Sequence, residues 1–501
     1  MTVARRHRLA CFAACAAILA VPGLLWAHAH LVKSDPSANA KLATPPTAIR
    51  LWFSEAPELA LTQVMLLAPD RAHIPLDSVT KDPQSSMAVR VSIPERLAPG
   101  RYTVVWRTAA ADGHPSGGRI AFTVLPGATA ATHARHDSAT QSASSAADRS
   151  TALLPATPAN AVSDSTFNAG SLAYVVVRWL SFTTLLALIG VNAFHWLVLG
   201  TLRRQGGAHA AFVERASRRA ASVGMGAAIF LGLASLARLY AQLLAMNDMP
   251  EMAHETSAGT ILLHTVWGAG WIAQMSLVII ALGGFAMARR ASRTSWTISL
   301  IAAVLLAFTP AFGGHAVATP RFAAITILAD GLHVLGAGGW LGSLLVVIVA
   351  GIPVALTLDT NDRGPAVATL INAFSPLALG FAALVAASGL VSAWLHLEHI
   401  RALWQSDYGR ILLIKLGVLS LVVLTGAYNW LRVRPSLGDA QGAVRIRRSA
   451  IAELCIGAIV LVVTAILTAT ATPADQVTVG PVRNSDVVSA VAPRRSRLDF
   501  N

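Results

Sequence analysis

Two short stretches near the N-terminus hold residues that together could bind a metal ion. The first is WAHAHL, in which His28 directly follows an apolar leader ending at Ala27. The second is DGHPSGG, in which Asp112 and His114 are two residues apart, so that both side chains point to one face of an extended segment. If the leader is cleaved after Ala27, the His28 α-amine and imidazole, the His114 imidazole and the Asp112 carboxylate supply three nitrogens and one oxygen. That ligand set suits tetragonal Cu(II).

Each stretch also has a simpler explanation. A histidine can follow a cleavage site by chance, and Asp-Gly is typical of a turn. His30 adds an alternative, because an N-terminal amine with histidine in third place can bind Cu(II) unaided through deprotonated backbone amides.

The composition predicts a membrane protein with a soluble part. The chain has 501 residues, of which 54% are hydrophobic and 13% charged, against about 25% charged in soluble domains. Residues 1–27 have the basic start, apolar run and small final residue of a secretory signal peptide. The net charge of +14 arises in the leader, membrane loops and tail, while residues 28–127 are nearly balanced, so no nucleic-acid partner is expected. Only Cys455 remains after cleavage, which excludes an internal disulfide.

The mature chain divides into regions of different pattern. Runs such as AIRLWFSE and GRYTVVWRTAA alternate apolar and polar residues between Pro and Gly, which predicts an all-β sandwich or barrel over residues 28–127. Residues 128–168 are rich in Ala, Ser, Thr and Pro, as in a disordered linker. Residues 169–472 form an all-α polytopic membrane domain, and residues 473–501 a tail.

Eight apolar segments in the membrane domain are long enough to span a bilayer. They lie near 171–199, 219–245, 259–286, 295–313, 324–350, 374–397, 409–431 and 449–471. Lys and Arg concentrate in the loops after odd-numbered segments, which places those loops in the cytoplasm and the β domain and tail outside.

Histidines and methionines of the membrane domain gather toward the predicted outer side. The loop MNDMPEMAHE brings three thioethers and an imidazole within nine residues, and thioethers favour Cu(I). The alternative is that the methionines pack and the histidines are solvated. The candidates for the place where copper enters, and for its path, are Met246, Met249, Met252, His254, His264, His315, Asp330, His333, His396 and His399.

Ionisable residues within the spans call for a structural or functional explanation, because burying a charge in a bilayer is costly. Asp330 and His333 share one helical face, and Glu453 lies early in the last segment. These residues fit two interpretations equally well: they could line a permeation or proton path, or they could form interhelical ion pairs. The glycine run GAGGWLG, 336–342, predicts close helix packing.

Two long parts of the chain resemble known families. Residues 28–126, with HAHLVKSDPSANAKL, LWFSE and GRYTVVWRTAAADGHPSGGRIAFTV, resemble the copper resistance protein C family of periplasmic copper-binding β-barrels. Residues 171–471, with HVLGAGGWLGSLL, FSPLALGFAALVAASGLVSAW and YGRILLIKLGVLSLVVLTGAYNW, resemble the inner-membrane copper resistance protein D family. The resemblance implies a natural fusion of the two.

By this resemblance, the N-terminal domain has an Ig-like or cupredoxin-like fold, and His28, Asp112 and His114 are its Cu(II) ligands. Some members of the C family also hold Cu(I) at a methionine-rich site. This β domain has only Met65 and Met87, so we expect it to bind Cu(II) and leave Cu(I) to the membrane domain.

The sequence therefore predicts a bacterial inner-membrane protein that captures periplasmic Cu(II) and transports copper, most simply inward, in copper homeostasis or resistance. No nucleotide-binding loop is present to power export. Other periplasmic copper proteins are further candidate partners. One rival is a periplasmic copper buffer whose membrane part is an anchor. An oxidative enzyme with an N-terminal histidine brace is another, but Asp112 would occupy the position that such enzymes keep open, so no enzymatic activity is expected.

Overall fold

The computed structural model describes most of the β domain and of the membrane domain. The described residues are 31–110, 113, 115–126, 171–206, 210–247, 256–290, 292–313, 323–397, 399–429, 431 and 440–470.

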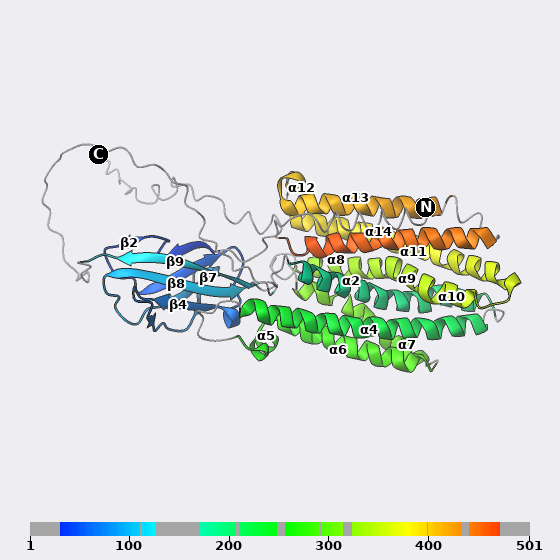
Figure 1. Ribbon diagram of the computed structural model, residues 1–501, viewed down its shortest axis with the longest axis horizontal. Coiled ribbons are helices and arrows are strands. Elements are labelled where there is room, and N and C mark those ends of the chain that lie inside the picture. The colour runs from blue at the N-terminus through cyan, green and yellow to red at the C-terminus, as the bar shows by residue number, and fades with distance from the viewer. Residues whose placement is uncertain are drawn as a thin grey trace, which may run out of the picture.

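Two facing β-sheets form the N-terminal domain (Figure 1). One sheet has the order β1-β3-β7-β6 and the other β2-β9-β8-β4-β5. The longest pairing joins β8 to β9, antiparallel from Gly100 opposite Val124 to Ala109 opposite Pro115. The strands are β1 Leu31–Asp35, β2 Lys41–Leu42, β3 Ala48–Phe53, β4 Gln63–Leu67, β5 His73–Ile74, β6 Thr80–Asp82, β7 Ser85–Ser92, β8 Gly100–Ala109 and β9 Pro115–Val124.

The alternating pattern of the sequence places the core of this sandwich. In β3, Ile49, Leu51 and Phe53 are buried, while the residues between them are partly exposed. The Phe53 ring meets Trp106 of β8 edge to face, with ring centroids 5.2 Å apart. The predicted all-β sandwich is confirmed. The DGH stretch falls between β8 and β9, and Gly113 is the residue of it that the structure describes.

Helices make up the rest of the described chain. They are α2 Leu172–Ala193, η2 Phe194–Val198, α3 Leu199–Arg204, α4 Ala210–Met246, α5 Ala258–His264, α6 Val266–Ala288, α7 Arg293–Leu306, η4 Thr309–Gly313, α8 Ala323–Ala337, η5 Gly338–Gly342, α9 Ser343–Val346, η6 Val347–Gly351, α10 Ile352–Ala355, α11 Thr360–Leu397, α12 Ala402–Gln405, α13 Asp407–Tyr428 and α14 Ala440–Leu467. A short 3-10 turn, η1 Leu59–Leu61, lies in the β domain.

Eight helical stretches among the described residues are long and apolar enough to cross a membrane, as the sequence predicts. Three helices begin nine or more residues before their predicted apolar segments: α4 begins at Ala210, α11 at Thr360 and α14 at Ala440. Hydropathy finds only the part of a helix that is apolar. A helix continues into a polar stretch as long as its residues favour it: α11 begins with the polar stretch TNDR, and the early part of α4 carries Glu214, Arg215, Arg218 and Arg219.

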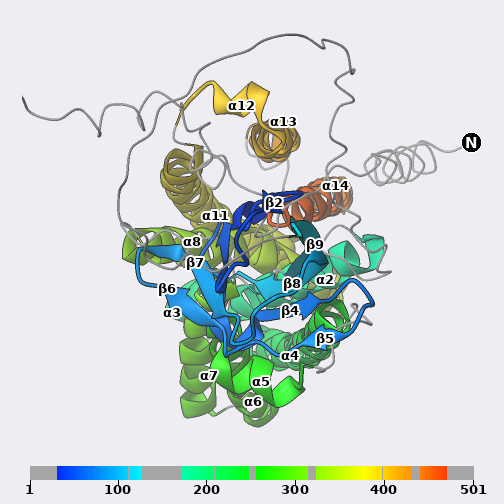
Figure 2. The same cartoon turned by 90° about the vertical axis from the view of Figure 1, so that its left-hand side faces the viewer.

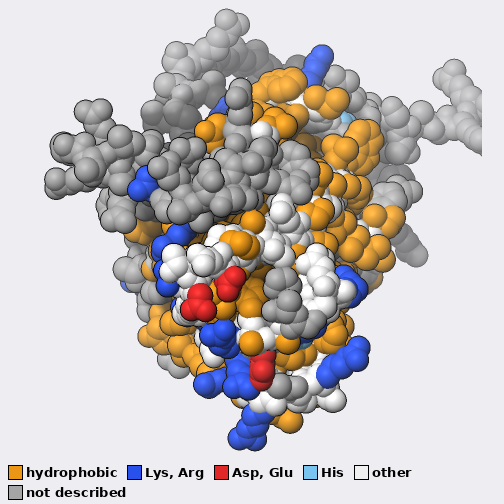
Figure 3. Space-filling view, turned by 90° about the vertical axis from the view of Figure 1, so that its right-hand side faces the viewer, with side chains coloured by type: hydrophobic (Ala, Val, Ile, Leu, Met, Phe, Trp, Pro, Cys, Tyr) orange, Lys and Arg blue, Asp and Glu red, His pale blue; other side chains and the backbone are white. Residues whose placement is uncertain are grey.

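The helices run along the long axis of the molecule, and the β domain lies at one end of the bundle (Figure 1). Seen from that end, the strands lie in front of the bundle, and α12 and α13 stand to one side (Figure 2). At the opposite end, which we call the far end, Lys and Arg side chains gather (Figure 3). Exposed arginines on the helix ends there are Arg203, Arg204, Arg215, Arg218, Arg219, Arg289, Arg290, Arg293, Arg363, Arg447 and Arg448.

The predicted close packing at the glycine run is confirmed. A Cβ on Gly342 would collide with the carbonyl oxygen of Leu186 in α2, so no larger residue fits there. The last five residues of this run form η5, a π-helical turn within the fifth span. This turn contacts both α2 and α11. Such turns often occur at functional sites.

Candidate metal centre

Gly113, in the β8–β9 turn, contacts the membrane domain. Its carbonyl oxygen accepts a hydrogen bond from the side-chain amide of Gln242 in α4. A Cβ on Gly113 would lie 2.6 Å from Cδ1 of Trp267 in α6, and φ is +84°, a conformation that favours glycine. The residue between the two predicted ligands of this turn therefore contacts two membrane helices.

Two polar contacts hold the β domain next to this point. The Arg107 guanidinium donates to the Gln63 amide oxygen and to the Thr256 hydroxyl, both at 3.0 Å. Burial lowers the pKa of Arg107, but a guanidinium remains charged at neutral pH. The Glu58 carboxylate accepts from the backbone N–H of Val266 at 3.3 Å, where it complements the positive N-terminus of α6.

An apolar cluster completes the junction. Leu61 and Ala109 of the β domain pack with Met246, Ile261 and Trp267 of the membrane domain. The Met246 side chain is fully buried there. Its thioether is thus part of the packing between the domains, while Met249, Met252 and His254 lie outside the described residues.

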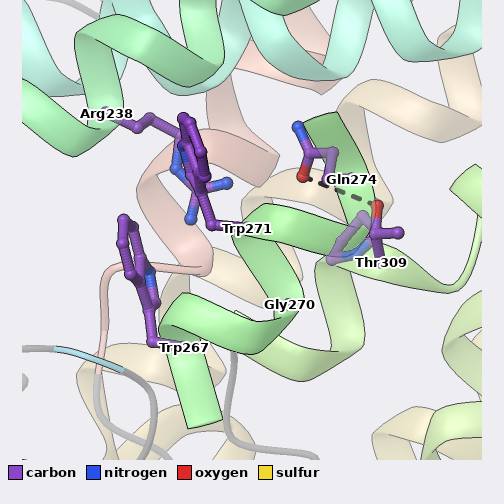
Figure 4. A pocket seen from close by; sticks show the side chains of 7 residues that line it. Arg238, Trp267, Gly270, Trp271, Gln274 and Thr309 are labelled. Atoms are coloured by element: carbon purple, nitrogen blue, oxygen red, sulfur yellow. Dashed lines mark hydrogen bonds between the residues drawn. The ribbon is translucent and has the colours of Figure 1, made fainter. Parts of the chain in front are cut away.

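A small pocket opens beside Trp267 in the membrane domain (Figure 4). Arg238, Trp271, Gln274 and Thr309 line it, and the Thr309 hydroxyl donates to the Gln274 side chain at 3.5 Å. The Arg238 guanidinium carbon lies 6.0 Å from the centre of the Trp267 ring. Because this arginine is positively charged, the pocket is a poor place for a bare copper cation.

The proposed Cu(II) ligands themselves are not described. His28, His30, Asp112 and His114 lie outside the described residues, as does His315. Among the residues that are described, no three His, Cys, Asp or Glu side chains come together in a way that could hold a metal ion.

A second group of candidates lies between α8 and α11. We call this group the ladder, and it comprises Asp330, His333, Ser388, Ser392 and His396. The Ser392 hydroxyl of α11 donates to the Asp330 carboxylate of α8 at 2.9 Å. One turn further into the membrane, His333 Nδ1 lies 3.1 Å from the Val385 carbonyl oxygen and 3.3 Å from the Ser388 hydroxyl. The structure thus brings Asp330 and His333 together with two serines on the facing helix.

The two histidines of this ladder use the same ring nitrogen, Nδ1, to contact a backbone carbonyl. His333 Nδ1 faces the Val385 carbonyl, and His396 Nδ1 lies 2.6 Å from the Ser392 carbonyl. A carbonyl only accepts, so Nδ1 carries the proton in both rings and Nε2 keeps its lone pair. Metal-binding histidines usually have this arrangement, in which one ring nitrogen donates to the protein and the other binds the ion.

The remaining histidines differ from these two. His264 and His399 are exposed near the β-domain end of the bundle. His195, toward the far end, is buried and stacks on Trp296 with ring centroids 3.6 Å apart. Its Nε2 lies 3.3 Å from the Arg203 guanidinium, which only donates, so the lone pair is used and a metal would meet a positive charge. His195 is a packing residue.

Family models match most of the described chain. A CopC domain matches residues 31–125, a copper resistance protein D-like N-terminal domain residues 168–325, and copper resistance protein D residues 368–467. The chain joins a CopC family domain to a CopD family domain. Copper resistance and transport is therefore the role of its families, and the CopD domain makes it a multi-pass membrane protein.

Individual proteins are similar to all or part of this chain. The copper transport protein CutJ of Bacillus subtilis (strain 168) is 27% identical over 471 residues, which cover 90% of this chain and 76% of that protein. Protein YobA of Escherichia coli (strain K12) is 35% identical over 100 residues, 20% of this chain and 81% of that protein. The crystal structure of CopC from Methylosinus trichosporium OB3b covers 20% of this chain and 94% of its own, with 28% identity and a TM-score of 0.19.

Several residues of the CopC–CopD junction and of the CopD ladder were missed by sequence reasoning. Gln242 and Trp267 contact the CopC turn, and Ser388 and Ser392 contact His333 and Asp330. The two serines are four apart, so helical spacing places them on one face and could have marked them as partners. Nothing local to Gln242 or Trp267 distinguishes them from other residues near a helix end.

The CopD ladder also contains a positive charge. The Lys415 ammonium of α13 interacts electrostatically with Asp330 and with His333. Lys415 lies one turn from Val418 and Leu419, which pack with Phe381 of α11, so it is on the face of α13 that meets the ladder. The charge of Asp330 is therefore offset by a cation of the protein itself.

Proposed function

We propose that the chain captures Cu(II) in the periplasm with its CopC domain and moves copper inward through its CopD domain across the bacterial inner membrane. In this proposal residues 28–127 are the capture domain and residues 169–472 the transport domain, and the ligands of Cu(II) are His28, Asp112 and His114. His30 is the alternative ligand. The chain transports copper and catalyses no reaction on a substrate.

The position of Gly113 is the observation that carries the proposal. It lies between two proposed ligands, and it contacts Gln242 and Trp267 at the β-domain end of the bundle. A copper ion held by that turn would be next to the membrane domain, where transfer needs only a short movement. The relative named as a copper transport protein covers both domains, which supports transport over storage.

The ladder supports a path for the ion. His396, Asp330 and His333 follow one another from the β-domain end into the membrane, and the Nε2 atoms of the two histidines have no hydrogen bond to the described residues. The Cu(II) captured outside takes up one electron from an external reductant before Cu(I) ligands such as the loop methionines hold it. Met249, Met252 and His254 are proposed to receive it.

Transfer between the domains can be followed with an isotope. We expect labelled Cu(II), bound to the full chain in vesicles with the β domain outside, to appear inside the vesicles once ascorbate is added. Gln242→Leu removes the bond to Gly113 and should slow this transfer several-fold while Cu(II) still binds. Gln84→Leu makes the same substitution at an exposed glutamine of the β domain that is not part of the junction, and is the control.

Two results would contradict the proposed transfer. One is label that stays on the outside and is removed by an external chelator in the intact protein. The other is a Gln242→Leu variant that transfers copper as fast as the intact chain, because the docked turn would then have no part in the step.

A further inference from the structure

A buried carboxylate lies deeper in the bundle, beyond the ladder. Glu453 of α14 is only 7% exposed. The Asn429 amide nitrogen lies 3.3 Å from its carboxylate, and the Trp340 indole is a second hydrogen-bonding partner. The Ser449 hydroxyl donates to the Asn429 oxygen, which fixes that amide with its nitrogen toward Glu453.

An apolar layer separates Glu453 from the ladder. We define this layer as Trp340, Phe381, Val418, Val422, Ile456 and Val460, which pack together from four different parts of the fold. On α13, Lys415 precedes the layer and Asn429 follows it. The two are fourteen residues apart, about 21 Å along a helix. The ladder is therefore on the β-domain side of the layer and Glu453 on the far side.

The two carboxylates differ in their charge balance. Asp330 interacts with the Lys415 ammonium. The ion pairs found among the described residues do not include Glu453, whose described partners are a neutral amide and a neutral indole. A carboxylate in an apolar interior is costly unless a cation accompanies it. Glu453 is thus a place where a mobile cation would be stabilised.

We propose that Glu453 is the inner station for the transported copper cation, on the release side of the apolar layer. This inference rests on the inward transport proposed above. A carboxylate oxygen is a weak ligand for copper compared with imidazole or thioether. Weak binding suits a release station, because an ion must be able to leave the last site on its path. Cys455, two residues further along, is exposed on another face of α14 and is not part of the station.

The test uses the purified full chain in vesicles, with Cu(I) supplied outside under anaerobic conditions and a Cu(I)-binding dye inside. Glu453→Gln keeps a carbonyl acceptor and removes the charge, and should lower the uptake rate by about tenfold or more, the factor that corresponds to 1.4 kcal/mol. Glu453→Asp keeps the charge and should retain more of the rate. Glu214→Gln, an exposed carboxylate at the far end, should leave it unchanged.

Equilibrium binding separates this inference from the proposed function. If the intact chain takes up no copper, dialysis against Cu(I) still compares the copper bound by the intact chain and by a folded Glu453→Gln variant. We expect the variant to bind less. Equal binding, or Glu453→Gln uptake equal to that of the intact chain, would overturn the inference, and a change confined to proton movement would make Glu453 a proton site.

Discussion

Replacing His114 by Ala should lower the affinity of the full chain for Cu(II) by about a hundredfold or more, since loss of a residue that only supports a metal ligand already costs 10–100-fold. The variant removes one of three nitrogens and leaves the His28 chelate and the Asp112 carboxylate. Competition with a Cu(II) chelator of known affinity measures the change. His73→Ala is the matched control, because His73 is an exposed histidine of the same domain.

The same experiment tests the alternative ligand. If His28 and His30 bound Cu(II) unaided, His114→Ala would bind as tightly as the intact chain and His30→Ala would weaken binding instead. An N-terminus other than His28 in the mass spectrum of the mature protein would remove the α-amine from the site and contradict the proposed ligand set.

The second large effect concerns Asp330 and Lys415. Asp330→Asn leaves the Lys415 ammonium buried without its carboxylate, and Lys415→Met leaves the carboxylate without its ammonium. Removing one member of a fully buried pair costs about 3–5 kcal/mol, and because both side chains are only partly buried here the cost should be smaller. Both single variants should therefore unfold at lower temperature than the intact chain in detergent. The double variant has no buried charge at this position and should recover most of the stability.

Copper uptake by the double variant decides between the two explanations of these residues. If the ladder is a path for copper, the stable double variant should fail to transport, because it lacks the Asp330 carboxylate. If Asp330 and Lys415 only hold α8 and α13 together, the double variant should transport normally. Lys415→Arg keeps the positive charge and serves as the control for stability.

Local patterns in the sequence were enough to predict the elements. Alternation gave the buried residues Ile49, Leu51 and Phe53, and apolar length gave the eight spans. Both signals depend on neighbours along the chain. The N-terminal parts of α4 and α11 were missed because charged residues, such as Glu214 and Arg215 in α4 and Asp362 and Arg363 in α11, interrupt the apolar signal there.

Contacts between distant segments could not be predicted in the same way. Gln242 lies far from Gly113 in the sequence, and only the packing of the CopC domain on α4 brings them together. Met246 was a candidate for the copper path from its sequence context alone, and only the structure shows that its side chain is buried in the apolar cluster with Leu61 and Trp267. The location of Glu453 beyond an apolar layer likewise depends on how several helices pack.

Cytoplasmic copper tests the central claim most directly. A cytosolic Cu(I) sensor should report more copper in cells that express the intact protein than in cells without it, and less of that increase with the His114→Ala variant. That result would show an importer supplied by the CopC domain. Unchanged or lower cytoplasmic copper, together with more copper in the periplasm, would contradict inward transport and favour a device that sequesters copper.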